Sequence, residues 1–217
     1  MSTSKKLNTY AFIDASNLFY GGEKSLGWKI DYNKLAKYLS TKYGVSKIFY
    51  FGGVEINNFK YDYLKHTTVP LEKLRKYLEK AVLKNDDRLN KDSPSLTINH
   101  LQRVKFYQKL EQFGYELWLK PVKTYPQEDG VTKRKANCDV DMAFVMMREI
   151  ESYTKVIFLS GDGDFLPLLK HLKSCHKEVI VLARGPRTAR EIRQIAGSNF
   201  RDFVRIKHEI GFKEKRH

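Results

Sequence analysis

Short apolar runs alternate along this chain with longer segments in which apolar residues recur every three or four positions. The short runs are typical of buried strands, and the wider spacing is typical of amphipathic helices. Glycine and proline stand at several of the boundaries, where they end or open an element. The predicted strands are residues 8–13, 46–51, 115–119, 156–159 and 178–182, with a possible edge strand at 202–206. The predicted helices are residues 31–43, 70–89, 99–113, 139–151, 165–173 and 187–196.

The alternation of strands and helices favours an α/β fold on a mostly parallel sheet of five or six strands, flanked by helices. A chain of 217 residues is an ordinary size for one domain, so we expect a single domain over residues 1–217. Residues 55–98 exceed what a crossover needs and are interpreted as a helical insertion. The remaining predictions are loops at 91–97 and 121–137 and a charged tail at 211–217.

Acidic residues stand where predicted strands end. Asp14 directly follows the first strand, and Asp162 and Asp164 directly follow the fourth. Asp139 begins the helix that leads into the fourth strand, so it starts at the same edge of the sheet. Ligands of parallel α/β sheets bind beyond the carboxyl ends of the strands, so we expect these acids to meet there.

Four carboxylates at one edge need a counter-ion, because like charges in close proximity disfavour ionisation. Oxygen ligands favour hard ions, Mg²⁺ or Mn²⁺, and such ions activate water and stabilise displacement at phosphorus. Each acid taken singly is as well explained as a helix cap or a turn residue, so it is their convergence that favours a metal site. Asn17 and Ser160 are expected at the same edge. Asp141 lies two residues beyond Asp139 on the helix and would reach an ion only through water.

The chain is basic. Lys and Arg outnumber Asp and Glu by 40 to 25, which favours an anionic partner, most often nucleic acid and less often a membrane surface. Arg187, Arg190 and Arg193 recur at helical spacing, so we expect them on one helix face, where solvent exposure alone is the alternative reading for Arg190 and Arg193. The residues predicted to contact phosphates are Lys133, Arg134, Lys135, Arg184, Arg187 and Arg190.

The sequence carries no signal for secretion or for a membrane. The start MSTSKKLN has no apolar run after its lysines, and no stretch approaches the roughly 18 apolar residues of a membrane helix. Its cysteines, Cys138 and Cys175, form no CxxC pair. These features favour a reducing, cytoplasmic location.

Three segments taken together resemble the NYN domain, a PIN-like branch of the metal-dependent nucleases. They are FIDASNLFYG, KANCDVDMA and SGDGDFLPLLKHL, and the resemblance extends over about residues 9–54 and 105–206. It implies a PIN-like, Rossmann-like fold. By position, it implies that the metal is held and the reaction carried by Asp14, Asp139, Asp162 and Asp164, with Asn17 supporting the first acid. Residues 55–98 have no counterpart in the family core, and Val145 stands where the family often has a further acid.

The sequence therefore predicts a metal-dependent nuclease that hydrolyses phosphodiester bonds with Mg²⁺ or Mn²⁺. The resemblance favours an endoribonuclease acting on single-stranded RNA, whereas the residues alone leave RNA or DNA, and endo- or exonuclease action, open. One alternative is a non-catalytic nucleic-acid-binding module of the same fold. A haloacid dehalogenase-type phosphatase is a further alternative, although that class needs a second Asp where Ser16 stands. The insertion could serve a homodimer or a protein partner.

Overall fold

The computed structural model describes residues 8–19, 24–56, 58–84, 94–126 and 132–212. The strands are β1 (Thr9–Asp14), β2 (Val45–Val54), β3 (Tyr115–Pro121), β4 (Lys123–Pro126), β5 (Thr132–Lys135), β6 (Lys155–Leu159), β7 (Glu178–Ala183) and β8 (Phe200–Asp202). The α-helices are α1 (Ala15–Asn17), α2 (Lys24–Leu26), α3 (Tyr32–Tyr43), α4 (Leu71–Lys84), α5 (Pro94–Gln112), α6 (Asp139–Arg148), α7 (Leu166–Ser174), α8 (Arg190–Ala196) and α9 (Lys207–Ile210). Short 3-10 helices are η2 (Ile150–Ser152), η3 (Gly163–Phe165), η4 (Gly185–Arg187), η5 (Gly197–Asn199) and η6 (Phe203–Ile206).

Among the described residues, the main sheet has six strands in the order β3-β2-β1-β6-β7-β8, and β4 pairs with β5 in a separate ribbon. β1 runs parallel to β2 on one side and to β6 on the other, so that Phe12 lies between Phe49 and Phe158. The pairs β6–β7 and β7–β8 are also parallel. The predicted α/β fold with a mostly parallel sheet is therefore confirmed.

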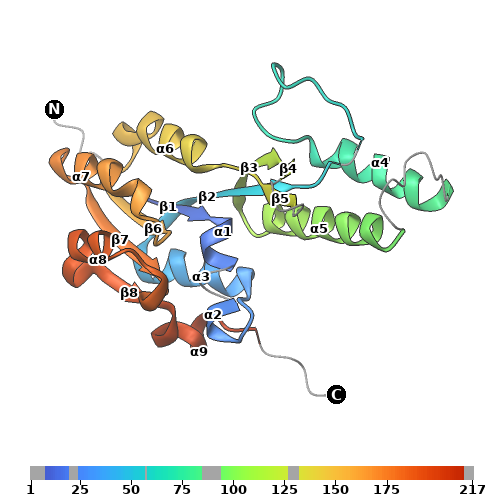
Figure 1. Cartoon of the computed structure of the whole chain (residues 1–217). Helices are drawn as coiled ribbons and strands as arrows, with labels where there is room; N and C mark the ends of the chain where they lie inside the picture. The colour runs from blue at the N-terminus through green and yellow to red at the C-terminus, as the bar shows by residue number, and fades with distance from the viewer. Residues whose placement is uncertain (1–7, 20–23, 57, 85–93, 127–131, 213–217) are drawn as a thin grey trace. The chain divides into compact units, whose positions relative to one another are not determined.

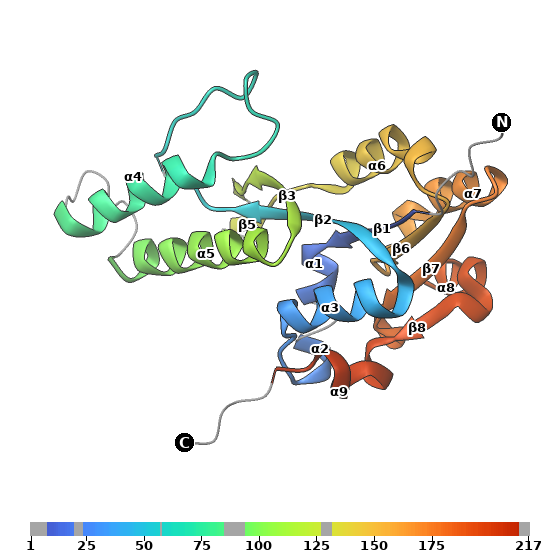
Figure 2. The same cartoon turned by 180° about the vertical axis from the view of Figure 1, so that it is seen from behind.

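The direction of the strand order changes between β1 and β6. From β1 the chain passes outward to β2, whereas from β6 it passes outward to β7 on the other side. Because the crossovers are right-handed, the connecting helices leave on opposite faces of the sheet, with α3 on one face and α6 and α7 on the other (Figures 1 and 2). The carboxyl ends of β1 and β6 thus form a topological switch point, the usual ligand site of an open α/β sheet.

The chain divides into two compact units. The first comprises residues 1–51, 113–116 and 139–217, and the second comprises residues 52–112 and 117–138. The predicted insertion at 55–98 lies within the second unit, which also holds most of α5 and the β4–β5 ribbon. One domain carrying an insertion remains our interpretation of this division.

Aromatic rings fill the core of the first unit around β1. Every residue of β1 is buried, as its apolar run predicted. Phe12 stacks on Phe49 with ring centroids 5.0 Å apart, and Tyr153 meets Phe12 edge-on at 5.8 Å. The Tyr153 hydroxyl donates to the Met146 carbonyl at 2.9 Å, so this buried ring also satisfies its polar group.

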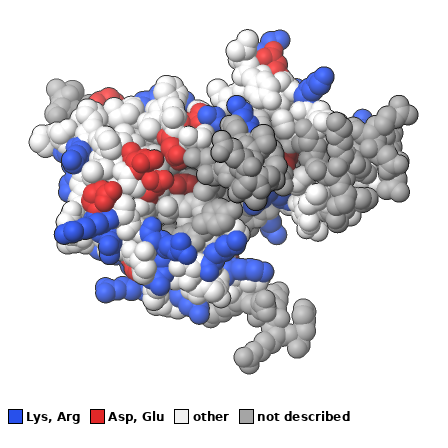
Figure 3. Space-filling view, in the orientation of Figure 1, with Lys and Arg blue, Asp and Glu red and all other residues white. Residues whose placement is uncertain are grey.

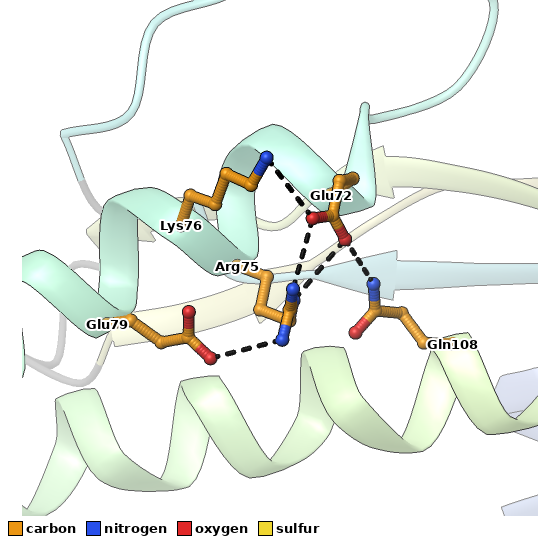
Figure 4. Close-up of polar contacts among 5 residues, drawn as sticks. All are labelled: Glu72, Arg75, Lys76, Glu79 and Gln108. Carbon is orange, nitrogen blue, oxygen red and sulfur yellow. Dashed lines mark hydrogen bonds and ion pairs between the residues drawn. The ribbon is translucent and has the colours of Figure 1, made fainter.

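Helices α4 and α5 lie side by side in the second unit (Figure 1). A polar network joins their exposed faces: Gln108 Nε2 on α5 donates to Glu72 Oε2 on α4 at 2.9 Å (Figure 4). Arg75 bridges Glu72 and Glu79 at 3.0 Å and 3.3 Å. The hydrogen bond from Arg75 lowers the pKa of Glu72. Because these groups are exposed, the network contributes little to stability.

The glycine pair at the end of the second predicted strand does not end it. β2 continues through Gly52 and Gly53 to Val54, whereas the sequence predicted a strand end at residue 51. A Cβ atom on Gly53 would lie 2.6 Å from the Ala136 Cβ atom. The glycine therefore permits a close approach of two chain segments, a role for which a strand interior also uses glycine.

Two predicted loops are partly regular structure. α5 begins at Pro94, so the predicted helix start at residue 99 is wrong and residues 94–97 of the predicted loop are helical, whereas residues 91–93 lie outside the described residues. Proline is favourable in a first helical turn, where its missing N–H is not needed. Within the predicted loop at 121–137, β4 and β5 pair antiparallel with Lys123 opposite Lys135. This ribbon is polar and lacks the apolar alternation by which strands are recognised.

The C-terminal edge also differs from the prediction. β8 occupies residues 200–202, and the predicted strand at 202–206 is instead mostly η6. Asp202 causes the change, because its side chain accepts a hydrogen bond from the Val204 amide at 3.0 Å and starts the helical turn. Most of the predicted tail, and the end of the helix predicted at 70–89, lie outside the described residues. None of the helices in the described ranges is long and apolar enough to cross a bilayer.

Candidate functional site

Asp14 is the last residue of β1 and the cap of α1. Its Oδ1 atom accepts hydrogen bonds from the backbone amides of Ser16 at 2.9 Å and Asn17 at 3.1 Å. Its Oδ2 atom accepts from the Ser160 hydroxyl at 3.1 Å. The side chain is therefore fixed by groups from two strand ends, and only 9% of the residue is exposed.

A chain of hydrogen bonds extends from Asp14 across the switch point. Ser160, fully buried after β6, donates to Asp14 and accepts from the Asp162 amide at 3.2 Å. The Asn17 Oδ1 atom accepts from the Gly161 amide at 3.0 Å. The polar residues predicted at this edge, Asp14, Asn17, Ser160 and Asp162, are thus brought together by direct contacts.

Electrostatics at this position disfavour an ionised Asp14. Burial raises the pKa of Asp14 from 3.8 to about 6, although hydrogen bonds from Asn17 and Ser160 act in the opposite direction. The charge of Asp139 raises the pKa of Asp14 further. A cation beside these two carboxylates would restore the ionised form, because an opposite charge favours it.

The other predicted acids lie in the first turn of α6 and in η3. Asp139 opens α6, and Asp141 follows it in the same first turn, with both side chains partly exposed. Asp164 is exposed in η3, and its amide donates to Asp162 Oδ1 at 3.0 Å. Within the described part of the chain, no three Asp, Glu, His or Cys side chains are grouped closely enough to hold an ion on their own. A divalent ion at this position would therefore take one or two carboxylates and keep several waters as its remaining ligands.

The loop after β7 packs directly on the loop after β6. The Ala189 amide donates to the Gly161 carbonyl at 2.9 Å. A Cβ atom on Gly161 would lie 2.7 Å from the Thr188 Oγ1 atom and 2.9 Å from its Cα atom. The glycine allows this approach, which holds the segment carrying Asp162 in place.

The arginines predicted to contact phosphates differ in their surroundings. The Arg184 Nη1 atom donates to Asp202 Oδ2 at 3.2 Å, so an ion pair holds this side chain on the loop after β7. Arg187 ends η4, whereas α8 begins only at Arg190. The predicted single helix face of Arg187, Arg190 and Arg193 is therefore wrong, because extended residues separate Arg187 from the helix. Arg187, Arg190 and Arg193 are each exposed.

Lys133, Arg134 and Lys135 lie on β5 in the second unit. Their side chains fall outside what the structure describes, so their contact with phosphate stays a prediction. On the face of the first unit drawn in Figure 3, acidic side chains gather in one group, and Lys and Arg side chains lie along its border.

Glu191 is a further acid that the sequence did not single out. It lies in the first turn of α8, and its Oε1 atom is 2.6 Å from where a Gly163 Cβ atom would be. Its carboxylate therefore packs against the segment between Asp162 and Asp164. No local signal marks it, since a Glu in a first helical turn is ordinary. Val145, at the position of the further family acid, is fully buried.

Comparisons with known proteins agree with this fold. The family model described as "NYN domain" matches residues 93–203, about half of the chain. The low amplitude and bright protein LabA of Synechococcus elongatus is 23% identical over 184 residues, which cover 84% of this chain and 76% of that protein.

Solved structures also resemble this one. A Vibrio parahaemolyticus protein of unknown function has a TM-score of 0.61 at 17% identity, over 98% of this chain and all of that one. The flap endonuclease of bacteriophage T5, crystallised with DNA and metal ions, has a TM-score of 0.42 at 12% identity, over 88% of this chain and 60% of that one.

Proposed function

This chain belongs to the NYN domain family, whose fold is PIN-like, and on that premise we propose that it is a Mg²⁺- or Mn²⁺-dependent endoribonuclease acting on single-stranded RNA. Family membership and the switch-point site both support a nuclease as the class of function. The observation that carries the proposal is the buried Asp14 carboxylate, held by Ser160 and by two backbone amides, with Asp139 close enough to raise its pKa.

The residues of the site have separable roles in this proposal. Asp14 and Asp139 would hold the ion, and Asp162 and Asp164 would lie beside it. Asp14 enters the site already oriented, because three hydrogen bonds fix both of its oxygens. Asn17 uses its Oδ1 atom on the Gly161 amide, which leaves its Nδ2 group as a donor for a phosphate oxygen. When bound, the ion would supply a water of lowered pKa and neutralise charge on the phosphate.

The test is incubation of the purified protein with labelled single-stranded RNA and DNA in Mg²⁺, Mn²⁺ or chelator. We expect cleavage of RNA with either ion and none in chelator. Cleavage of a circular RNA would identify endonuclease action, because an exonuclease needs an end. Asp14→Asn and Asp162→Asn should each abolish cleavage while the circular dichroism spectrum stays unchanged. Asp31→Asn is the matched control, because Asp31 caps α3 through a similar hydrogen bond away from the switch point.

A second candidate function is nucleic-acid binding without turnover. It is favoured by the finding that no three potential ligands cluster among the described residues. Binding of RNA with no cleavage in either ion would select this candidate. Full activity in both Asp variants would exclude the switch-point site altogether.

A further inference from the structure

The loop between β2 and α4 carries aromatic residues at alternate positions. Residues 59–66 read FKYDYLKH, and we call this segment the aromatic loop. It lies in the second unit and precedes residues 93–203, over which the family model matches. Figure 1 draws it as the extended connection before α4. Nothing in the switch-point site accounts for it.

The rings of the aromatic loop form a continuous series. Phe59 packs on Tyr77 of α4 with ring centroids 5.5 Å apart, which ties the series to a helix. Phe59 and Tyr61 are stacked, with centroids 6.0 Å apart and an interplanar angle of 19°. Tyr61 and Tyr63 follow at 4.4 Å. Burial raises the pKa of Tyr61 to about 12.

The series ends at an exposed ring. Tyr63 is 62% exposed and Leu64 is 99% exposed. A turn presents them, because Asp62 Oδ1 accepts from the Leu64 amide at 2.9 Å and from the Lys65 amide at 3.3 Å. The far end of the loop is anchored where the Val69 amide donates to the Leu119 carbonyl of β3 at 3.1 Å. The exposed ring is therefore held by the turn and by the rings beneath it.

The charge of the aromatic loop is positive. Lys60 is exposed, and the Lys65 side chain is 81% exposed. The acid of the loop, Asp62, is engaged by two backbone amides and by Lys65 Nζ at 3.5 Å. Figure 3 shows basic side chains at the outer end of this loop beside one acidic group. A basic segment around an exposed aromatic ring suits a ligand that is both anionic and aromatic.

We propose that the aromatic loop is a binding site for single-stranded nucleic acid, in which an unpaired base stacks on Tyr63 and the Lys60 and Lys65 ammonium groups contact the flanking phosphates. Such sites combine aromatic platforms with cations along the backbone. Duplexes are disfavoured because their bases already stack on one another. This site goes beyond the proposed hydrolysis, since it requires no metal and no acid of the switch point.

The loop chemistry favours nucleic acid over a protein partner. A protein interface usually has an apolar centre. Next to Tyr63 the loop exposes only one large apolar side chain, that of Leu64. Lysine is also depleted at protein interfaces relative to the rest of a surface. Lysines that flank an exposed ring match instead the repeat of phosphate and base along a strand.

The test measures the binding of fluorescein-labelled oligonucleotides by anisotropy in chelator, so that no cleavage occurs. The probes are a single-stranded oligo(dA), an abasic strand with the same number of phosphates, and a duplex. We expect the wild type to bind oligo(dA) more tightly than the abasic strand. Tyr63→Ala should weaken binding of oligo(dA) about 5- to 150-fold and leave binding of the abasic strand unchanged.

Two controls separate stacking from other effects of the change. Tyr63→Phe retains the ring and should bind like the wild type. Leu64→Ala removes an exposed apolar side chain next to the ring and should also bind like the wild type. Lys65→Gln should lower the slope of log affinity against log salt by about 0.7 for its one phosphate contact.

Equal binding of oligo(dA) by wild type and Tyr63→Ala would overturn the proposal. If Tyr63→Ala instead converts a dimer to a monomer in size-exclusion chromatography, with nucleic-acid binding unchanged, the loop is a protein interface and the proposal fails. Because binding is measured in chelator, its failure is distinct from a failure of cleavage. Asp31→Asn, the control of the cleavage assay, should bind oligo(dA) like the wild type.

Discussion

Replacement of Asp14 by Asn should stabilise the metal-free protein at neutral pH. A pKa near 6 in the folded protein, against 3.8 in the unfolded chain, is a difference of about 2 units. At 1.36 kcal/mol per unit, ionisation of Asp14 costs the folded state about 3 kcal/mol. Asparagine avoids this cost because it does not ionise, and its Oδ1 atom can still accept the two backbone amides that cap α1.

The pH dependence follows from which state binds the proton. Below pH 3.8, Asp14 is protonated in both states and contributes nothing. Between pH 3.8 and 6 the folded state binds more protons than the unfolded state, so the free energy of unfolding falls as pH rises. Above pH 6 the full cost is present. The stability difference between Asp14→Asn and wild type should therefore grow from near zero at pH 3.8 to about 3 kcal/mol at pH 8.

Thermal unfolding followed by circular dichroism in chelator measures this difference. For a chain of this length, about 3 kcal/mol corresponds to a Tm that is higher by about 6–12 °C in the variant at pH 8. Added Mn²⁺ should raise the Tm of the wild type and leave that of Asp14→Asn unchanged, because a ligand of the folded state stabilises by mass action. Asp31→Asn, at the cap of α3, serves as the control. Identical pH profiles for wild type and Asp14→Asn would refute the burial argument.

Three further substitutions test how the site is supported, each by Tm and by the cleavage assay. Gly161→Ala should cost about 1–3 kcal/mol and reduce cleavage, because its Cβ would meet Thr188 and displace the segment carrying Asp162. Asp202→Ala should cost about 1–3 kcal/mol, since it leaves the Gly185 and Val204 amides without their acceptor. Glu72→Ala removes a residue of the exposed network between α4 and α5. It should change Tm less than Gly161→Ala or Asp202→Ala does, and it should leave cleavage unchanged. A larger effect at Glu72 than at Gly161 would reverse this ranking of buried and exposed contacts.

The strand ends at the switch point were predictable because they rest on strong local signals. An apolar run that stops at Asp14 marks a buried strand without any knowledge of its neighbours, and the same holds for the run before Ser160. Parallel strands then place both residues at one edge. The contact between Asp14 and Ser160 at 3.1 Å follows from that topology, although its length and donor do not.

Other features depend on long-range contacts that no local sequence pattern predicts. The sequence predicts a strand end at Gly53, because glycine usually interrupts strands. The glycine is needed instead because Ala136, far along the chain, leaves no room for a Cβ atom at this position. The ion pair of Arg184 with Asp202 joins the ends of β7 and β8. The sequence predicted the second of these strands only as an edge strand at 202–206, so this contact could not be foreseen. The ring series of the aromatic loop depends on Tyr77 of α4 and on the turn at Asp62, so the sequence indicated only that these residues belong to an insertion.

The hydrogen bond between Asp14 and Ser160 joins residues 146 positions apart. A nascent chain that has just emerged with β1 therefore carries Asp14 in contact with water, without Ser160 and without the partner strand β6. β6 and the loop after β7 are synthesised only after the whole of the second unit. Ribosome-bound fragments that end before β6 would hold the aromatic loop and the second unit but no assembled acidic edge, so the switch point forms only after β6 has left the ribosome.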